Sequence, residues 1–112
     1  MSVEIENILF NSQQRIKKAL ERYLPDESSK PSILHQAMRY AALNGGKRIR
    51  SALIYSLGEA LEIDHEVQDL LASSIESIQA SSLIHDDLPA LDNAELRRGK
   101  PACHVVFGEA VA

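Results

Sequence analysis

Apolar residues recur along most of this chain three or four positions apart, which is the spacing of one face of an α-helix. The predicted helices are residues 3–24, about 32–43, about 47–61, 65–88 and the start of a further helix over 105–112. Asp64 is the expected N-cap of the fourth helix, because aspartate accepts hydrogen bonds from free backbone N–H groups there. In the third helix, the residues expected to face inward are Ile49, Ala52, Leu53, Leu57, Ala60 and Leu61.

Residues that disfavour helix separate these segments. Two prolines bracket a polar stretch over residues 25–31, and Gly45 with Gly46 should end the second helix. Pro89 should end or kink the fourth helix, and Gly99-Lys100-Pro101 forms a further break. No repeat, domain boundary or convincing β-hairpin signal is present. The expected fold is all-α, an antiparallel helix bundle in which residues 1–112 form a single helical domain.

Composition narrows the classes of function. The chain has 112 residues, 45% of them apolar, and a net charge of −4, which argues against a nucleic-acid-binding protein. One cysteine, Cys103, cannot form an internal disulfide and is typical of a reducing compartment. No apolar stretch is long enough to span a membrane, and we expect a cytoplasmic protein.

Three carboxylates, Asp86, Asp87 and Asp92, gather at the end of the fourth predicted helix. Six residues separate Asp86 from Asp92, which would place them on different sides of a continuous helix, but a break at Pro89 can turn Asp92 back toward Asp86. Acids at a helix C-terminus oppose the helix dipole, so a cluster there is costly without a cation. The alternative is that the three acids cap the helix or are merely solvated. We favour a site for Mg²⁺, which prefers carboxylate oxygens.

Two basic clusters accompany the acids. Lys47 and Arg50 lie at a predicted helix start, where unpaired N–H groups also favour anions, and their spacing places them on one helix face. Arg97 and Arg98, with Lys100, follow the acidic cluster. Each cluster alone is more often a solvated surface. Together with the acids they favour a protein that binds phosphorylated ligands through a metal and direct ion pairs.

The same stretches resemble the trans-isoprenyl diphosphate synthases, the family of farnesyl and geranylgeranyl diphosphate synthases. The similarity runs in order through nearly the whole chain and is closest to the bacterial short-chain branch. The segments that carry it are Gly45-Gly46-Lys47-Arg48-Ile49-Arg50, Asp86-Asp87-Leu88-Pro89-Ala90-Leu91-Asp92, Leu96-Arg97-Arg98-Gly99-Lys100-Pro101 and Phe107-Gly108-Glu109-Ala110. The resemblance implies the isoprenoid synthase fold, of which this chain would be the incomplete N-terminal portion.

The resemblance also implies a role for each matching residue. Asp86 and Asp92 would be ligands of Mg²⁺, supported by Asp87 as a further catalytic residue, and Arg97 would contact the allylic diphosphate, dimethylallyl or geranyl. The residues implied to hold isopentenyl diphosphate are Gly46, Lys47, Arg50, Gln79 and Arg98. Gln79 stands where bacterial members usually have His, but its amide can still donate a hydrogen bond.

Two departures from the family pattern bear on function. Ser81 stands five residues before Asp86, where bacterial farnesyl synthases commonly carry Tyr, and a serine resembles enzymes that make the longer geranylgeranyl product. The family's second aspartate-rich motif is not in this sequence, so we expect the chain alone to be inactive. Family members are generally homodimers, which implies a homodimer here. The alternative hypothesis is a non-catalytic helical subunit or interaction module that associates with a full-length synthase.

Overall fold

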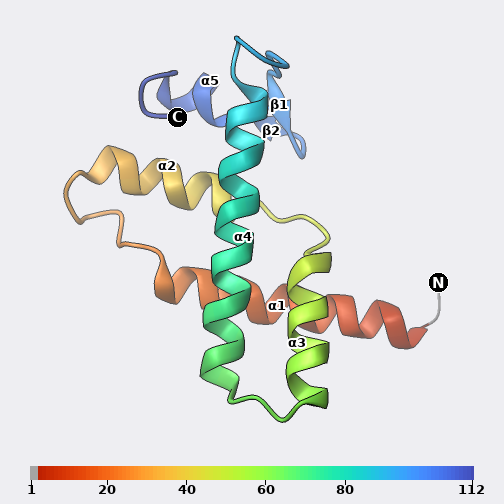
Figure 1. Cartoon of the computed structure of the whole chain (residues 1–112). Coiled ribbons are helices and arrows are strands. Elements are labelled where there is room, and N and C mark those ends of the chain that lie inside the picture. Colours follow the sequence, from red (N-terminus) through yellow and green to blue (C-terminus); the bar gives the residue numbers. More distant parts are fainter. Residues whose placement is uncertain (1–2) are drawn as a thin grey trace. The chain divides into compact units, whose positions relative to one another are not determined.

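The computed structural model describes residues 3–112, and over that range it is mostly helical (Figure 1). The all-α prediction is confirmed, because the four long helices lie close to the predicted positions. The helices are α1 (Val3–Tyr23), α2 (Ser32–Ala42), α3 (Ile49–Ala60), α4 (His65–Asp87) and α5 (Cys103–Phe107), and the strands are β1 (Leu96–Arg97) and β2 (Lys100–Pro101). Among the described residues, no helix combines the length and the apolar character needed to cross a membrane.

The capping residues largely act as the sequence predicted. The carboxylate of Asp64 accepts a hydrogen bond from the backbone N–H of Glu66 at 2.9 Å, which satisfies a free donor in the first turn of α4. Helix α4 ends at Asp87, two residues before Pro89. Helix α3 begins at Ile49 rather than at Lys47, so Lys47 lies in the preceding loop.

Two predictions for the C-terminal segment are wrong. A short β-hairpin pairs β1 with β2 antiparallel, and the intervening Arg98 and Gly99 both have positive φ, 52° and 78°, as a two-residue type I′ turn requires. Strands of two residues are too short to show alternation in the sequence. The last helix is α5, which ends at Phe107 because Gly108 takes a φ of 85°, so residues 108–112 do not continue it.

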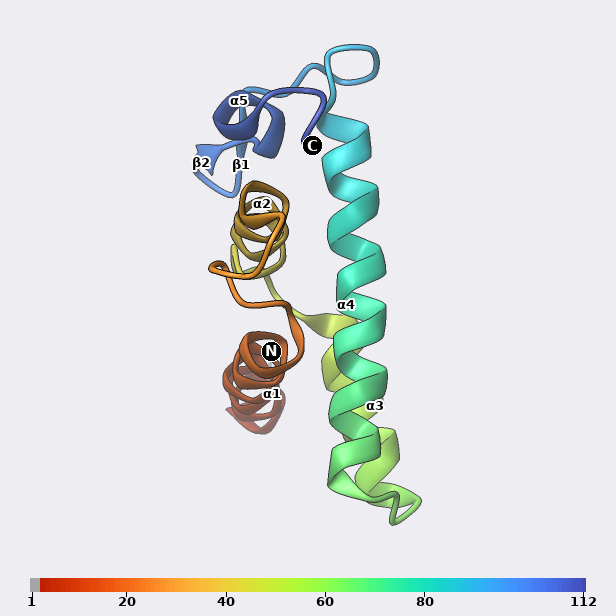
Figure 2. The ribbon, with the colours of Figure 1, turned by 90° about the vertical axis from the view of Figure 1, so that its left-hand side faces the viewer.

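The described chain forms two compact units, and α4 contributes to both. The first unit contains α1 and Gly45–Ser77. Here α1 packs against α3, with Ile16 and Leu20 fully buried, and the loop 61–64 joins α3 to the first part of α4 (Figures 1 and 2). Arg15 of α1 binds the carboxylate of Asp69 at 3.0 Å and lies 4.0 Å above the ring of Tyr55.

The second unit contains Leu24–Asn44 and Ile78–Ala112. In this unit α2 packs against α5, as Figure 2 shows. The ring of Tyr40 meets the edge of Phe107 with centroids 5.5 Å apart, and its hydroxyl donates to the carbonyl of Pro101. Arg39 ties the end of α2 to the loop after α1, since its Nε donates to the carbonyl of Pro25 at 2.8 Å.

The inward face predicted for α3 is mostly wrong. Leu53, Leu57 and Leu61 are 65%, 61% and 62% exposed, and Ile49 is also exposed. The buried face of α3 consists of small and polar residues with one aromatic, and of the predicted set only Ala52 belongs to it; its members are Ser51, Ala52, Tyr55 and Gly58. A helix pattern shows which residues are apolar, whereas close packing against α1 selects the side with small side chains.

Gly58 generates a prediction about stability. A Cβ atom at this position would lie 2.6 Å from Cδ and 2.7 Å from Cγ of Gln68. Gln68 is 1% exposed and cannot easily move, because its amide nitrogen donates to the carbonyl of Ile63 at 2.7 Å and its oxygen accepts from Arg15 at 3.1 Å.

We therefore expect Gly58→Ala to lower the free energy of unfolding by about 1–3 kcal/mol, the usual cost of overpacking. This loss outweighs the gain of about 1 kcal/mol that alanine brings to a helix interior. Urea denaturation measures the change, with Ser56→Ala on the exposed side of the same helix as the control. A Gly58→Ala variant as stable as the parent chain would contradict the packing argument.

Candidate functional site

The chain turns back on itself directly after α4. The backbone N–H of Asp92 donates to the carbonyl of Asp86 at 2.9 Å, and the N–H of Ala94 donates to the carbonyl of Asp87 at 3.1 Å. These bonds close the free C-terminal carbonyls of the helix with the loop that follows Pro89. The predicted return of Asp92 toward Asp86 is thus confirmed at the level of the backbone.

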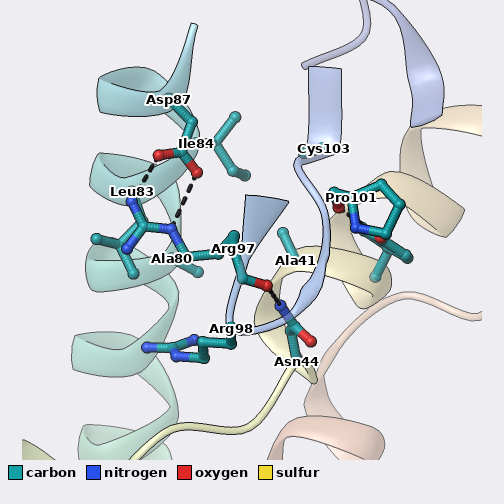
Figure 3. Close-up of a pocket in the computed structure, with 11 residues that line it drawn as sticks. Ala41, Asn44, Ala80, Leu83, Ile84, Asp87, Arg97, Arg98, Pro101 and Cys103 are labelled. Atoms are coloured by element: carbon teal, nitrogen blue, oxygen red, sulfur yellow. Dashed lines mark hydrogen bonds and ion pairs between the residues drawn. The ribbon is translucent and has the colours of Figure 1, made fainter. Parts of the chain in front are cut away.

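The buried carboxylate of Asp87 forms an ion pair with the partly exposed Arg97. The carboxylate is 3% exposed and accepts two hydrogen bonds, from Nε of Arg97 at 3.0 Å and from Nη2 at 2.5 Å (Figure 3). This bidentate contact uses two of the five N–H donors of the guanidinium, so three remain for another ligand. The pair joins the end of α4 to the hairpin.

The electrostatic environment keeps Arg97 charged. Its pKa is raised above the usual value, first by the hydrogen bonds that it donates to Asp87 and further by the charges of Asp87, Asp86 and Asp92. Arg97 is therefore a permanent cation beside three carboxylates, of which one is bound to it directly.

Asn44 also positions the hairpin, a role that the sequence did not reveal. Its amide nitrogen donates to the carbonyl of Arg97 at 3.0 Å, so Arg97 is held through its side chain by α4 and through its backbone by the end of α2 (Figure 3). In the sequence, Asn44 precedes two glycines, which is a typical turn pattern and gives no sign of this contact with Arg97.

A small cavity lies beside this ion pair. Its volume is about 20 Å³, which is room for about one water molecule and not for a substrate. Figure 3 shows its lining, which comes from α2 and the residues just after it, the end of α4, the hairpin and the start of α5. The residues are Tyr40, Ala41, Asn44, Ala80, Leu83, Ile84, Asp87, Arg97, Arg98, Pro101 and Cys103.

The other two carboxylates of the cluster remain accessible. Asp86 and Asp92 are exposed, and neither takes part in an ion pair within residues 3–112. No group of three or more His, Cys, Asp or Glu side chains suited to a metal is gathered in the described chain. Two carboxylates suit Mg²⁺ when water or phosphate oxygens complete its octahedron, which is how this ion is usually bound. Gln79 on α4 is half-buried, and Arg98 is exposed in the hairpin turn.

The remaining predicted residues belong to the first unit. Gly46 has a φ of 111°, and Lys47 and Arg50 are exposed and form no ion pair within the described residues. Lys47 precedes α3, so the shared helix face that the spacing suggested does not apply to it. Arg48, between the two cations, is bound instead to the buried carboxylate of Glu76.

Comparison with known proteins identifies the family. The sequence profile of the family described as polyprenyl synthetase matches residues 31–112. The chain is 48% identical over 100 residues to a farnesyl diphosphate synthase of Haemophilus influenzae, covering 89% of this chain and 34% of that enzyme. It is 46% identical over 110 residues to a farnesyl diphosphate synthase of Geobacillus stearothermophilus, covering 98% of this chain and 37% of the relative.

A solved structure agrees with the sequence relatives. The apo crystal structure of an FPP/GFPP synthase from Zymomonas mobilis superposes with a TM-score of 0.90 at 38% identity, covering 99% of this chain and 40% of that one. The chain thus spans about a third of the length of the curated relatives it matches. On this combined agreement of sequence profile, curated relatives and fold, the chain belongs to the polyprenyl synthetase family.

Proposed function

We propose that this chain carries substrate-binding residues of a prenyltransferase that condenses isopentenyl diphosphate with an allylic diphosphate, either dimethylallyl or geranyl. The observation that carries the proposal is the turn after α4. There two exposed carboxylates, Asp86 and Asp92, lie beside Arg97, a cation fixed by a third carboxylate. The similarity to farnesyl diphosphate synthases supports this substrate class.

Mg²⁺ fits the exposed carboxylates of Asp86 and Asp92, and when bound there it would supply positive charge that neutralises the leaving diphosphate. Asp87 is not available for this purpose, because both of its oxygens are bound to Arg97. We assign Asp87 the task of orienting Arg97, whose remaining N–H donors would hold the allylic diphosphate.

Isopentenyl diphosphate would be held by a second set of residues. Lys47 and Arg50 are exposed cations, and the backbone at Gly46 allows close approach of an anion. In the second unit, Gln79 and Arg98 offer an amide and a guanidinium, groups that suit the same substrate. Each donor is long or exposed, which suits binding of a multiply charged ligand from solution.

The reaction breaks the allylic C–O bond and releases diphosphate. A new C–C bond then forms from the alkene of isopentenyl diphosphate, and loss of a proton restores a double bond in the longer product. The contribution of the protein is to stabilise charge and to orient the two substrates. We propose farnesyl diphosphate as the product, because the segment Leu88-Pro89-Ala90-Leu91 resembles bacterial farnesyl synthases. We also expect a homodimer, as in the family at large.

The metal proposal predicts cooperative binding of Mg²⁺ and diphosphate. Mg²⁺ alone should bind weakly, because two carboxylates supply few of its six ligands, and a non-hydrolysable allylic diphosphate analogue should strengthen its binding by supplying more. Isothermal calorimetry of the chain with and without the analogue measures this. Tight binding of the metal alone, or no gain from the analogue, would count against the site.

Variants assign that binding to named residues. Asp86→Asn and Asp92→Asn should each weaken Mg²⁺ binding in the presence of the analogue by about tenfold or more, equivalent to about 1.4 kcal/mol. Glu95→Gln is the matched control, since Glu95 is an exposed acid in the same loop region. Equal losses in all three variants would indicate a general effect of charge rather than a site.

Turnover can be tested in a chimera in which this chain replaces the matching segment of the Geobacillus stearothermophilus enzyme. The chimera should convert isopentenyl and allylic diphosphates to a longer product, and Asp86→Asn should abolish this while Glu95→Gln should not. The chain alone should form no product, because it offers two carboxylates for a reaction that requires more metal-held charge. An inactive chimera that folds and binds both substrates would refute the prenyltransferase proposal.

Ser81 generates a prediction about product length. It is exposed on α4, five residues before Asp86, and therefore about 7.5 Å along the helix axis from the proposed metal site. A side chain at that distance can block a growing prenyl tail without touching the diphosphate. In the chimera, Ser81→Tyr should shorten the product without abolishing turnover. Chromatography of the products decides, and identical distributions would exclude Ser81 as the determinant of length.

A further inference from the structure

Glu76 is a buried acid with an unusual pair of partners. It lies on α4 with 4% exposure, and its Oε2 binds Nη1 of Arg48 at 2.9 Å, while the Arg48 side chain is itself only 8% exposed. Its Oε1 accepts a hydrogen bond of 2.6 Å from the hydroxyl of Ser51, which is fully buried. Both carboxylate oxygens of Glu76 are thus bound to the start of α3.

The segment bound by Glu76 has a backbone that does not form readily. Gly45 and Gly46 take φ values of 78° and 111°, and Arg48, the N-cap residue of α3, has φ 58° and ψ 40°. The left-handed region is unfavourable for a residue with a Cβ atom and persists only where neighbouring contacts enforce it. The buried ion pair with Glu76 is such a contact. A second is the hydrogen bond of 3.2 Å from the amide of Gln13 to the carbonyl of Lys47.

This arrangement divides three neighbouring cations between two environments. Arg48 is withdrawn into the unit and neutralised by Glu76, whereas Lys47 and Arg50 on either side of it are exposed. A buried guanidinium without its acid would be very costly, so Glu76 determines that Arg48 is the structural cation. The two flanking cations are then left for an external anion.

We propose that Glu76 is a positioning residue: by binding the guanidinium of Arg48 and the hydroxyl of Ser51, it fixes the loop 45–48 so that Lys47 and Arg50 are presented together to a diphosphate. The identity of that ligand, isopentenyl diphosphate, rests on the function proposed above. Glu76 does not touch the ligand. Its effect on binding is preorganisation, which removes the cost of ordering the loop when the anion arrives.

The test removes the buried pair without leaving a buried charge. In the double variant Arg48→Met with Glu76→Gln, amide hydrogen exchange over residues 45–48 should accelerate by about tenfold or more, while exchange in α1 stays unchanged. Binding of isopentenyl diphosphate, measured by calorimetry, should weaken by about tenfold or more. The single variant Glu76→Gln leaves the buried guanidinium of Arg48 without its acid, so it should show both effects at least as strongly as the double variant.

The matched control is the double variant Arg15→Gln with Asp69→Asn. It removes another interhelical ion pair of the same unit, with a distance of 3.0 Å, and should change neither loop exchange nor affinity. Unchanged exchange over residues 45–48 in the Arg48→Met, Glu76→Gln variant would overturn the inference, and so would faster exchange with unchanged affinity. A third outcome separates the two proposals. If the parent chain fails to bind isopentenyl diphosphate but loop exchange still accelerates in the variant, the proposed function is overturned, whereas the finding that Glu76 fixes the loop stands.

Discussion

The ion pair between Asp87 and Arg97 is the interaction on which the candidate site depends. A carboxylate buried to 3% exposure at the C-terminus of a helix is opposed both by loss of water and by the helix dipole. The bidentate guanidinium removes both penalties and in doing so fixes the hairpin to α4. Only the carboxylate of this pair is fully buried, and without Arg97 it would lack a counter-charge, so the position of Arg97 is strongly determined.

In each compact unit, one residue of a cluster of like charges is held in an ion pair while its neighbours are exposed. In the second unit, Asp87 is buried and bound to the partly exposed Arg97, and its neighbours Asp86 and Asp92 remain exposed. In the first unit, Arg48 is buried with Glu76, and Lys47 and Arg50 remain exposed. In each run of like charges, one member is neutralised inside and holds the backbone, while the others face solvent. In each unit this division of roles leaves accessible charges on a fixed backbone, which is what the proposed binding of anions or of a metal would require.

The packing of the helices explains why so many large apolar side chains are exposed. Helix α3 uses its small residues, Ser51, Ala52 and Gly58, to approach its neighbours closely, and its leucines lie on the opposite side. Gln68, which is almost fully buried, fills the space that Gly58 leaves and hydrogen-bonds at both ends of its amide. Hydrogen-bonded polar side chains such as Gln68 thus contribute to the internal packing of this unit.

Sequence alone determined the helices, their order and the family. Helical periodicity and capping depend on neighbouring residues, so the positions of α1, α2 and α4, and the backbone return of Asp92 to Asp86 after Pro89, could be predicted. The two-residue strands were missed because no periodicity can appear in so short a segment. The inward face of α3 was missed because the pattern does not specify what covers a helix.

Only the tertiary structure decided which charged side chains are held in ion pairs inside the protein and which are exposed. Asp86 and Asp87 are adjacent and chemically identical in the sequence, as are Arg97 and Arg98, and nothing local distinguishes them. Burial makes the distinction, because a charge removed from water requires a partner at hydrogen-bonding distance. That partner for Asp87 is ten residues away and for Arg48 twenty-eight residues away. The sequence determines the chemical groups available in these segments, and long-range packing selects which of them are buried and hold the backbone and which remain exposed.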